Sequence, residues 1–351
     1  MDYVFKLENN KTVFVFSAHK NMATSTSRTK IVEQLNTEEE LREQGVPRAI
    51  HFLQWTNIQI IEFLARNRLI RNTLNCDACR CARVFVVRSS SVDGFIWQCK
   101  RCGARKTIRV DSYFESDRIP LQTIMTIMGY WAFGQTIETI AREMNVSRNS
   151  VLKWGQKYRQ VIQASRLQNP PILGGYNEDE EEFGVVELDE THLVKESSRP
   201  GREQKDQWLF AGIQRETGKC FIMEVPNNKA TTLLPIIKKH VLPGTVIMTH
   251  ASKAYENLAN QDGGIYMHHI VGDKANIVSL QHPYIHTRGV ERLWSSLKLL
   301  LRLRNGFHRQ GFAEHLDEFA WRQETPTPEL FTEFLIMVAI THRIPKSEIY
   351  N

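Results

Sequence analysis

The stretch Val185-Val186-Glu187-Leu188-Asp189-Glu190 decides the fold of this chain. Its first four positions read as a buried β-strand, and the strand ends at acidic side chains. Further apolar runs downstream predict strands at 208–214, 220–225, 245–249 and 265–271. Helices are predicted between and after these strands, at 230–241, 252–260 and 290–303. Strands followed by alternating helices and strands indicate a mixed α/β sheet that is covered by helices.

The whole chain has 351 residues, of which 42% are hydrophobic and 24% charged, so two or three globular domains are predicted. No apolar run reaches the ~20 residues that a membrane helix needs, and the N-terminus does not resemble a secretory signal. We therefore expect a soluble, intracellular protein. The net charge of +6 is concentrated, because residues 100–159 hold eleven basic and five acidic side chains. Such patches favour a polyanionic partner, although solvated helix faces give a similar pattern.

Five of the six cysteines lie close together, which favours a metal site over a disulfide scaffold. Cys76-x-x-Cys79 and Cys99-x-x-Cys102 are separated by 19 residues, and Val92-Asp93-Gly94 supplies a turn between two apolar runs. Four thiolates on two such turns suit tetrahedral Zn²⁺. The spacing therefore predicts a structural zinc ribbon at 74–112. Cys81 could replace Cys79, but we interpret it as a bystander.

Residues 118–165 read as helices with the pattern of a helix-turn-helix. The first helix has one apolar face, Asn145-Val146 forms the turn, and Ser147 can cap the second helix. The side chains predicted to enter the major groove are Arg148, Asn149 and Ser150. Lys153 and Lys157 are predicted to contact phosphates, because the apolar positions between them face inward. The interpretation is a DNA-binding region, although any small helical pair shows a similar pattern.

Two acidic residues mark a candidate catalytic site in the α/β part. Asp189 ends the apolar run, and Glu291 opens the helix predicted at 290–303. Lys298 and Arg302 share the face of Glu291 on this helix. A carboxylate at the head of a basic helical face suits a divalent metal ion held beside a phosphate backbone. We therefore predict Asp189 and Glu291 as magnesium ligands and Lys298 and Arg302 as DNA contacts, although a single acid is more often a plain surface residue.

The domain boundaries follow from breaks in these patterns. Asn169-Pro170-Pro171 and Gly174-Gly175 interrupt the helical pattern, and an acidic run follows at 178–182. Like charges at neighbouring positions resist compaction, so we interpret this stretch as a linker. The predicted parts are an N-terminal extension at 1–70 that is partly disordered and then helical, the zinc ribbon at 74–112, the helix-turn-helix region at 118–165, the acidic linker at 166–183, the α/β domain at 184–325 and a C-terminal helical tail at 326–351.

From about Asp93 to Trp321 the sequence resembles the Merlin-type and ISXO2-like DDE transposases. The matching words are Asp93-Gly94-Phe95-Ile96-Trp97-Gln98-Cys99, Ile119-Pro120-Leu121, Val186-Glu187-Leu188-Asp189-Glu190, Gln207-Trp208-Leu209-Phe210-Ala211-Gly212-Ile213, Thr231-Thr232-Leu233-Leu234-Pro235, Leu242-Pro243-Gly244-Thr245 and His286-Thr287 followed by Val290-Glu291-Arg292-Leu293-Trp294. The resemblance implies an α/β ribonuclease-H-like catalytic core, a mixed sheet flanked by helices, preceded by a zinc ribbon and a helical helix-turn-helix region. It also implies that Asp189 is the first Asp of the catalytic triad and Glu291 its Glu.

The family's activity, if it extends to this chain, implies cut-and-paste transfer of double-stranded DNA at terminal inverted repeats, with Mg²⁺ or Mn²⁺ at Asp189 and Glu291. The residues expected to clamp the DNA backbone after the first strand are Lys195, Arg199 and Arg202. His286 matches a family motif and is a candidate for a position near the site. We also expect a homodimer in the nucleus, with neither a membrane nor a small-molecule substrate as partner.

The sequence departs from the family pattern at the second Asp. The family has this residue at the end of a strand shortly before Lys-Ala-Tyr, but here the strand 245–249 is followed by His250 and then by Lys253-Ala254-Tyr255. Two-metal phosphoryl transfer needs carboxylates that bridge cations ~3.5–4 Å apart, and a neutral imidazole supplies one nitrogen without negative charge. Glu187 could help to hold one ion but not replace the bridge. A milder departure is Arg288, where the family often has Asn.

Three hypotheses remain open. The first is a transposase-derived protein that keeps DNA binding and has lost strand cleavage or most of it. The second is an active transposase that tolerates His250, with Mn²⁺ as the metal. The third is a zinc-ribbon and helix-turn-helix regulator whose α/β domain serves for dimerisation or protein contacts. We favour the first, because one bridging carboxylate is missing.

Overall fold

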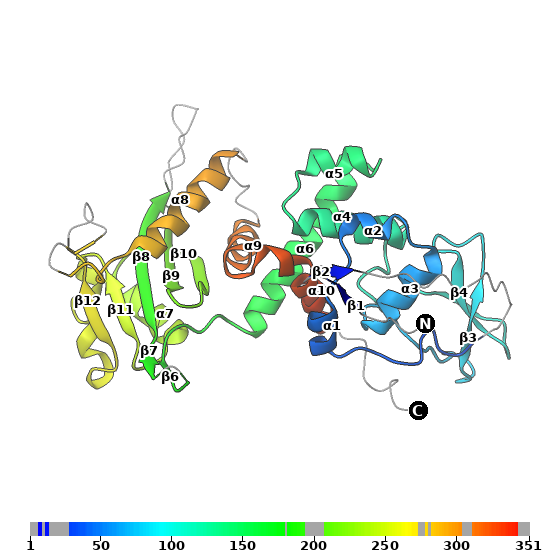
Figure 1. Cartoon of the computed structure of the whole chain (residues 1–351), viewed down its shortest axis with the longest axis horizontal. Helices are drawn as coiled ribbons and strands as arrows, with labels where there is room; N and C mark the ends of the chain where they lie inside the picture. The colour runs from blue at the N-terminus through cyan, green and yellow to red at the C-terminus, as the bar shows by residue number, and fades with distance from the viewer. Residues whose placement is uncertain are drawn as a thin grey trace.

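The structure is a computed structural model that describes most of the chain (Figure 1). The described residues are 6–8, 11–13, 28–179, 181–193, 207–272, 278–279, 282–303 and 311–342. The predicted backbone clamp of Lys195, Arg199 and Arg202 lies outside these residues, as does most of the predicted disordered start of the chain. Among the described residues, no helix combines the length and the apolar character that a membrane span requires.

A five-stranded sheet forms the C-terminal half of the structure (Figure 1). Its strands are β8 (Val185–Leu193), β9 (Gln207–Gln214), β10 (Cys220–Val225), β11 (Val246–Thr249) and β12 (Met267–Ile270). They lie in the order β10-β9-β8-β11-β12. The first three pair antiparallel, whereas β11 runs parallel to both β8 and β12. The prediction of a mixed sheet is therefore confirmed, and each predicted strand is present.

Helices cover both faces of this sheet. Successive side chains along a strand point to opposite faces, so each strand contributes to the core on either side. In β9, Phe210 belongs to the core beneath α7 (Ala230–His240). Its neighbour Leu209 belongs to the core beneath α8 (Arg288–Leu303) and α9 (Phe312–Glu324) on the other face. The prediction that helices flank the sheet is confirmed.

The helix predicted at 252–260 is wrong. Two 3-10 segments replace it, η1 (Lys253–Tyr255) and η2 (Leu258–Gly263). Ser252 caps the first segment by accepting a hydrogen bond from the amide of Ala254. Ser and Asn are common in this stretch, and their side chains compete with helical hydrogen bonds, so tertiary packing of the buried Tyr255 decides the local structure.

A second, three-stranded antiparallel sheet lies in the N-terminal half. It consists of β3 (Arg83–Val87), β4 (Phe95–Cys99) and β5 (Arg105–Thr107). The register pairs Phe85 with Trp97, and both rings are buried in the adjoining core. The hairpin predicted between the two cysteine pairs is present.

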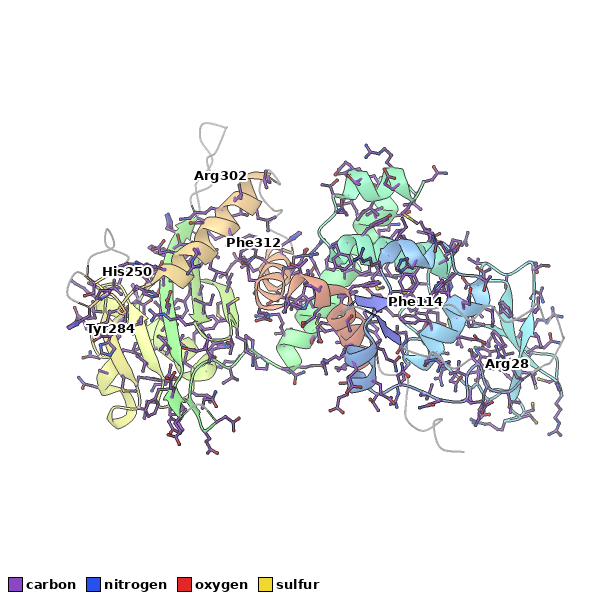
Figure 2. All side chains as sticks on the ribbon, viewed as in Figure 1. Arg28, Phe114, His250, Tyr284, Arg302 and Phe312 are labelled. Atoms are coloured by element: carbon purple, nitrogen blue, oxygen red, sulfur yellow. The ribbon has the colours of Figure 1, made fainter. Side chains whose placement is uncertain are left out.

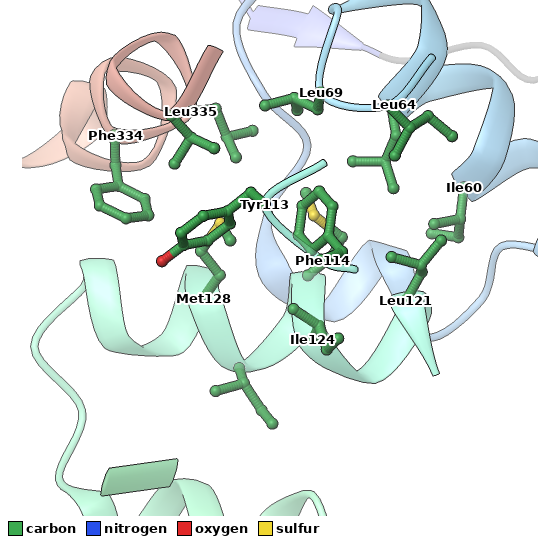
Figure 3. Packing of buried hydrophobic residues seen from close by; sticks show 14 of the residues in the cluster. Ile60, Leu64, Leu69, Tyr113, Phe114, Leu121, Ile124, Met128, Phe334 and Leu335 are labelled. Carbon is green, nitrogen blue, oxygen red and sulfur yellow. The ribbon is translucent and has the colours of Figure 1, made fainter. Parts of the chain in front are cut away.

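The rest of the N-terminal half is helical. Its elements are α1 (Glu38–Gln44), α2 (Ala49–Phe52), α3 (Asn57–Arg66), α4 (Leu121–Ala132), α5 (Ile137–Glu143), α6 (Arg148–Gln168), η3 (Thr327–Glu329) and α10 (Leu330–Thr341), together with a hairpin of β1 (Lys6–Glu8) and β2 (Lys11–Val13). Apolar side chains from α3, α4 and α10 surround Tyr113 and Phe114 in its core (Figure 3). We call residues 28–168 with α10 the N-terminal unit, and residues 172–324 the sheet unit.

The segment predicted as an acidic linker at 166–183 has a defined structure. Helix α6 continues to Gln168, and β6 (Tyr176–Asn177) and β7 (Glu182–Phe183) form a short hairpin. The amide of Gly175 donates to Thr245 Oγ1 at 2.8 Å, which ties the hairpin to the start of β11. Its described acidic side chains are exposed, so their mutual repulsion is screened by water.

Candidate catalytic edge and candidate metal centre

Three predicted site residues, Asp189, His250 and Glu291, lie where β8, β11 and α8 come together. Glu187 and Asp189 are two positions apart in β8 and therefore share one face of the sheet. Strand β11 pairs with β8 so that Met248 lies opposite Glu187. The same register, continued by two residues, brings His250 level with Asp189. Glu291 lies in the first turn of α8, the helix that covers this face.

His250 is buried against the beginning of α8, whose far end carries Arg302 (Figure 2). Its Nε2 lies 3.0 Å from Thr287 Oγ1 and 3.3 Å from Glu291 Oε1. Its Nδ1 is also buried and has no hydrogen-bond partner among the described residues. The imidazole thus makes direct contact with Glu291, one of the two predicted catalytic acids.

Asp189 is held by the same helix. The indole Nε1 of Trp294 donates to Asp189 Oδ2 at 2.9 Å, and both side chains are buried. Trp294 follows Glu291 by three residues, so the two side chains lie one turn apart on α8. The helix therefore sets the position of both predicted metal ligands.

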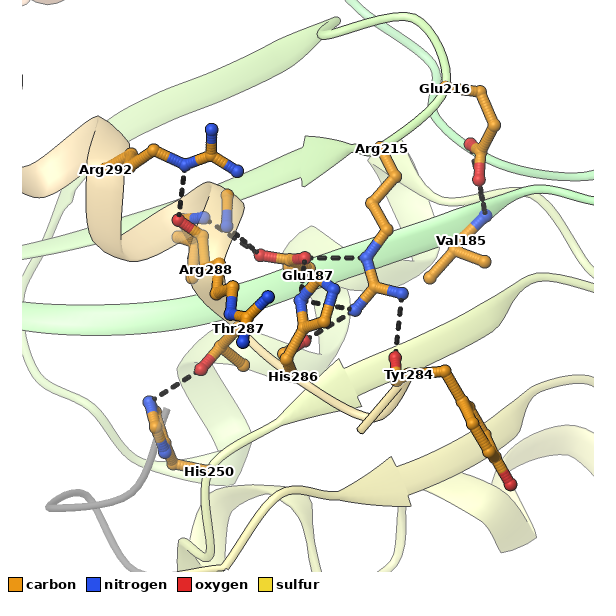
Figure 4. Close-up of polar contacts among 12 residues, drawn as sticks. Val185, Glu187, Arg215, Glu216, His250, Tyr284, His286, Thr287, Arg288 and Arg292 are labelled. Atoms are coloured by element: carbon orange, nitrogen blue, oxygen red, sulfur yellow. Dashed lines mark hydrogen bonds and ion pairs between the residues drawn. The ribbon is translucent and has the colours of Figure 1, made fainter. Parts of the chain in front are cut away.

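Glu187 does not point toward a metal position. Its Oε2 accepts hydrogen bonds from the amides of Gly289 at 2.6 Å and Val290 at 3.0 Å, at the start of α8 (Figure 4). Its Oε1 accepts from Arg215 Nε at 2.7 Å and lies 3.2 Å from His286 Nδ1. A carboxylate at a helix N-terminus is favoured by the unpaired amides and by the helix dipole. The expectation that Glu187 helps to hold an ion is corrected, because both of its oxygens anchor α8.

His286 lies beside Glu187 rather than beside Asp189. Its Nδ1 is 2.9 Å from Arg215 Nη2, and burial together with this guanidinium lowers the pKa of His286. The sequence reading missed Arg215, Thr287 and the hydrogen bond from Trp294. Thr287 and Trp294 stand inside the quoted family words, which was the available signal, whereas nothing local marks Arg215 as a partner of Glu187.

The donors at this edge do not fit a two-magnesium centre. Asp189 and Glu291 supply two carboxylates, and the third donor is a neutral nitrogen where Mg²⁺ prefers oxygen. One oxygen of Asp189 accepts from Trp294, and Glu291 lies against His250. Within the described residues, ligand atoms of three or more His, Cys, Asp or Glu side chains gather only around the cysteines.

Those cysteines form a candidate metal centre at the end of the three-stranded sheet. The Sγ atoms of Cys76, Cys79, Cys99 and Cys102 all lie within 4.8 Å of one another, close enough to share one metal ion. Backbone hydrogen bonds lower the pKa of Cys76 and of Cys99, which favours the thiolates that a metal needs, whereas hydrogen bonds with neighbouring thiols raise the pKa of Cys79 and of Cys102. Cys81 lies outside this group, with its Sγ 3.5 Å from the carbonyl oxygen of Cys79.

Helices α5 and α6 meet at the short turn predicted for the second motif. Ser147 caps α6 by accepting from the amide of Ser150 at 3.0 Å. Arg148, Asn149 and Lys153 are exposed at this end of α6. Arg148 Nε also donates to Glu138 Oε1 of α5 at 3.0 Å, in a pair that is open to solvent.

Lys157 differs from Lys153, although both were predicted to contact phosphates. Its Nζ lies 4.4 Å from the ring centroid of Trp154 and 5.8 Å from that of Tyr113. Burial lowers the pKa of this lysine. A cation held over aromatic rings is stabilised where it is, so Lys157 has to leave them to reach a phosphate.

Basic side chains are exposed along α8 on both sides of Glu291. The exposed cations of this helix are Arg288, Arg292, Lys298 and Arg302. Their spacing of four or six residues keeps them on the solvent side, opposite the buried apolar stripe of the helix. The helix thus carries an acid close to the sheet and positive charge along its outer face.

Comparison with known proteins places this chain among transposases. The family model described as the ISXO2-like transposase domain matches residues 183–324. An uncharacterized transposase-like protein of Haemophilus influenzae (strain ATCC 51907 / DSM 11121 / KW20 / Rd) is 30% identical over 104 residues, which cover 30% of this chain and 80% of that protein. Among solved structures, a chain of the simian T-cell lymphotropic virus intasome in complex with PP2A regulatory subunit B56 gamma is 13% identical, with a TM-score of 0.28 and coverage of 63% of this chain and 75% of that chain. The chain belongs to the ISXO2-like family of transposases and proteins derived from them.

Proposed function

We propose that this protein is a transposase-derived DNA-binding protein that recognises terminal inverted repeat DNA and has lost strand cleavage or most of it. The observation that carries the proposal is the buried imidazole of His250, whose Nε2 lies 3.3 Å from Glu291 Oε1. The imidazole takes the position at which a second carboxylate would bridge two metal ions. Without that negative charge the ions lack a shared anchor, and the rate of phosphoryl transfer falls by orders of magnitude.

The folded core supports the family assignment at a finer level. The strand order β10-β9-β8-β11-β12, with three antiparallel strands followed by two parallel ones, agrees with a ribonuclease-H-like domain. In such a domain the acids sit on neighbouring strands and on a helix that crosses them, as Asp189 and Glu291 do here. We propose that this inherited core now serves as a scaffold beside the DNA.

DNA binding is assigned to two exposed basic surfaces. One is the N-terminal end of α6, where Arg148, Asn149 and Ser150 would meet base edges as the recognition helix of a helix-turn-helix. Zn²⁺ at the four cysteines would stabilise the ribbon that precedes this helix pair. The other surface is the outer face of α8, with Lys298 and Arg302 toward phosphates.

The cleavage part of the proposal is tested by restoring the acid. We expect the wild type to leave supercoiled plasmid DNA intact in Mg²⁺ or Mn²⁺, because nicking needs the bridged ion pair. His250→Asp should nick the plasmid, and it should bind Mn²⁺ in an electron paramagnetic resonance titration that the wild type does not show. His250→Asn is the matched control, since it removes the imidazole without adding charge and should stay inactive.

Two results decide against lost cleavage. Clear nicking by the wild type that Asp189→Asn abolishes would identify an active enzyme that tolerates the imidazole. Failure of His250→Asp to gain both nicking and Mn²⁺ binding, in a protein that remains folded, would show that the missing carboxylate is not what limits the chemistry.

The DNA-binding part is tested with two lysines that lie one turn apart on α6. Lys153 is exposed, whereas Lys157 is held over Trp154 and Tyr113. We expect Lys153→Gln to weaken binding of a labelled duplex severalfold and to lower the salt slope by about 0.9, as loss of one phosphate contact does. Lys157→Gln should change binding less. Equal and negligible effects would remove α6 from the DNA interface.

A further inference from the structure

We propose that the metal end of the ribbon is a separate contact surface for the phosphate backbone of duplex DNA, with Arg80 as its main contact. The inference rests on the proposed DNA-binding function and adds a surface that neither α6 nor α8 provides. Three observations carry it: the backbone conformation at Arg80, the imbalance of charge around the cysteines, and the absence of acidic partners there among the described residues.

The two cysteine turns differ in one informative position. Each turn is followed by a residue in the left-handed region, Gly103 with φ of 72° and Arg80 with φ of 59°. Glycine is the ordinary choice there, because a side chain makes this conformation unfavourable. A Cβ at Gly103 would have open space around it. Packing therefore does not require a side chain at the residue that follows such a turn. Arg80 is exposed and keeps an unfavourable conformation that glycine would relieve.

Positive charge exceeds negative charge around the cysteines. Residues 74–107 contain seven Lys and Arg and two Asp. Four thiolates around one Zn²⁺ carry a net charge of −2, which leaves a positive excess. One of the two acids, Asp77, is already shared by Arg83 and Lys106, each at 3.5 Å. The surface therefore attracts anions even when the metal is bound.

The exposed cations come from both cysteine turns. Arg80 follows the first turn, and Lys100 and Arg101 lie inside the second. The turns converge, since Cys79 Sγ lies 3.4 Å from Cys99 Sγ, so the three cations surround one metal position. A cluster of this kind, gathered by the fold from two segments, suits successive phosphates along a backbone.

A simpler role for these cations is to offset the charge of the thiolates. Arg101 fits that role, because its Nη1 lies 3.9 Å from Cys81 Sγ. Arg80 and Lys100 have no ion pair or side-chain hydrogen bond to any other described residue. Their charges are available to an external anion, and the proposed DNA-binding function makes duplex DNA the anion at hand. The ribbon lies at the end of the molecule away from the sheet unit (Figure 1), so this contact lengthens the surface that the duplex covers.

The test uses a substitution that should favour the fold and weaken binding. Arg80→Gly removes the charge and relieves the left-handed conformation, so metal content and thermal stability should be kept or improved. Binding of a fluorescein-labelled duplex of arbitrary sequence, followed by anisotropy over a NaCl titration, should weaken severalfold. The slope of log K against log salt should fall by about 0.9, the value for one phosphate contact.

Arg68→Gly is the matched control. Arg68 is also an exposed arginine in the left-handed region, with φ of 60°, but it follows α3 rather than a cysteine turn. The variant loses the same charge and gains the same backbone freedom, and its binding should equal that of the wild type. A second variant, Lys100→Gln, should weaken binding as Arg80→Gly does.

The outcomes separate this inference from the proposed function. Binding by Arg80→Gly that equals binding by Arg68→Gly would overturn the ribbon surface and leave α6 and α8 as DNA contacts. Loss of metal from Arg80→Gly would also overturn it, since the charge would then support the thiolates. A wild type that binds no duplex at low salt would overturn the DNA-binding function itself.

Discussion

Asp93 and Arg109 form a buried, bidentate ion pair at the place where the ribbon meets the start of α4. Two nitrogens of Arg109 each lie 2.6 Å from an oxygen of Asp93, and neither side chain is exposed by more than 5%. Asp93 also accepts from the amide of Leu121, and Arg109 donates to the carbonyl oxygens of Asp117 and Ile119. The hydrogen bonds satisfy both charges, so removal of one partner leaves the other charge buried without compensation.

We expect Asp93→Ala to lower the free energy of unfolding by about 3–5 kcal/mol, the usual cost of an uncompensated buried charge. Urea denaturation measures the change. Glu143→Ala is the control, because Glu143 pairs with Arg142 in solvent and its loss should cost less than about 1 kcal/mol. Similar values for the two variants would contradict a structural role for the buried pair.

His268 predicts a pH dependence of stability. Burial lowers its pKa to about 4, and its Nε2 lies 2.8 Å from Thr249 Oγ1. The unfolded chain takes up a proton near pH 6.5 and the folded chain only near pH 4, so stability is complete above pH 6.5 and falls as the pH decreases through this window. After allowance for partial exposure, His268→Gln should remove about 1–2 kcal/mol of that fall. Urea denaturation at several pH values checks it, and the exposed His282→Gln should keep the wild-type dependence.

Individual site residues were predicted unevenly from the sequence. Asp189 and Glu291 were predicted from the end of an apolar run and the start of a helix, although β8 continues past Asp189 to Leu193. The use of Glu187 to anchor α8 does not follow, because its partners Arg215 and Gly289 are far away in the chain. Hydrogen bonds between distant segments leave no periodic signal, so only the folded chain reveals that Glu187 anchors a helix.

Helix α8 is held against β8 by side chains that alternate along the strand. Glu187 binds the first amides of the helix, and Asp189 accepts from Trp294 one turn later. Both acids lie on the face that α8 covers, which fixes the helix in position and in rotation. The candidate catalytic edge therefore depends on two acids that both bind α8, Glu187 through backbone amides and Asp189 through Trp294.

We expect Glu187→Ala to destabilise the protein by about 3 kcal/mol and to loosen the start of α8, because half-buried Arg215 loses its acid and two amides lose their acceptor. Hydrogen exchange read by mass spectrometry should show faster exchange at Gly289 and Val290. Glu216→Ala is the control, since Glu216 accepts from the amide of Val185 at the surface. Unchanged protection of α8 would show that the helix does not need the carboxylate.

We predict a metal ion at the four cysteines, and its removal should unfold the ribbon as one element. Its strands are short, and the four cysteines hold them at one end. A chelator, or Cys99→Ser, should speed hydrogen exchange throughout residues 83–107, because folding of such small sheets is coupled to metal binding. Cys81→Ser should keep both the metal and the protection. Full protection in the metal-free protein would contradict the coupling.

Most elements were predictable because periodicity reports burial. Strands of the mixed sheet and helices α7 and α8 keep clear patterns, and their types were predicted correctly. The stretch 252–260 lacks a clear periodic pattern. Its structure depends on Tyr255, whose hydroxyl donates to Oε2 of buried Glu190 at 2.6 Å. Local signals thus identify elements, whereas weakly patterned segments take their structure from what they pack against.

At the level of the whole molecule, three arginines join the N-terminal unit to the sheet unit. Arg166 of α6 forms ion pairs with Asp317 and Glu324 of α9 and donates to the carbonyl oxygen of Cys220 at 2.7 Å. Arg322 of α9 donates to two carbonyl oxygens at the end of α4, Trp131 and Ala132, and its guanidinium lies over the ring of Trp131. The third contact joins Arg159 and Glu318 at 3.8 Å. We call these contacts the arginine seam.

The arginine seam shows why packing does not follow the order of the sequence. The predicted boundaries divide the chain at 166–183 and again at 326, but Trp321 and α10 contribute to the core of the N-terminal unit. The chain leaves that unit along α6, builds the sheet, and returns through α9. Breaks in the sequence pattern indicate boundaries between parts of the chain. They do not indicate that a later segment packs against an earlier one.

The last prediction concerns cooperativity between the two units. The arginine seam and the shared helix α6 couple them, so calorimetry of the wild type should give a single unfolding transition. In the double variant Arg166→Met and Arg322→Met the side chains keep their apolar volume but lose the ion pairs and the bonds to α4. We expect two transitions in that variant, because each unit has its own apolar core. Arg142→Met, an exposed arginine outside the seam, should retain the single transition. Two transitions in the wild type, or one in the double variant, would mean that the arginines do not couple the N-terminal unit to the sheet unit.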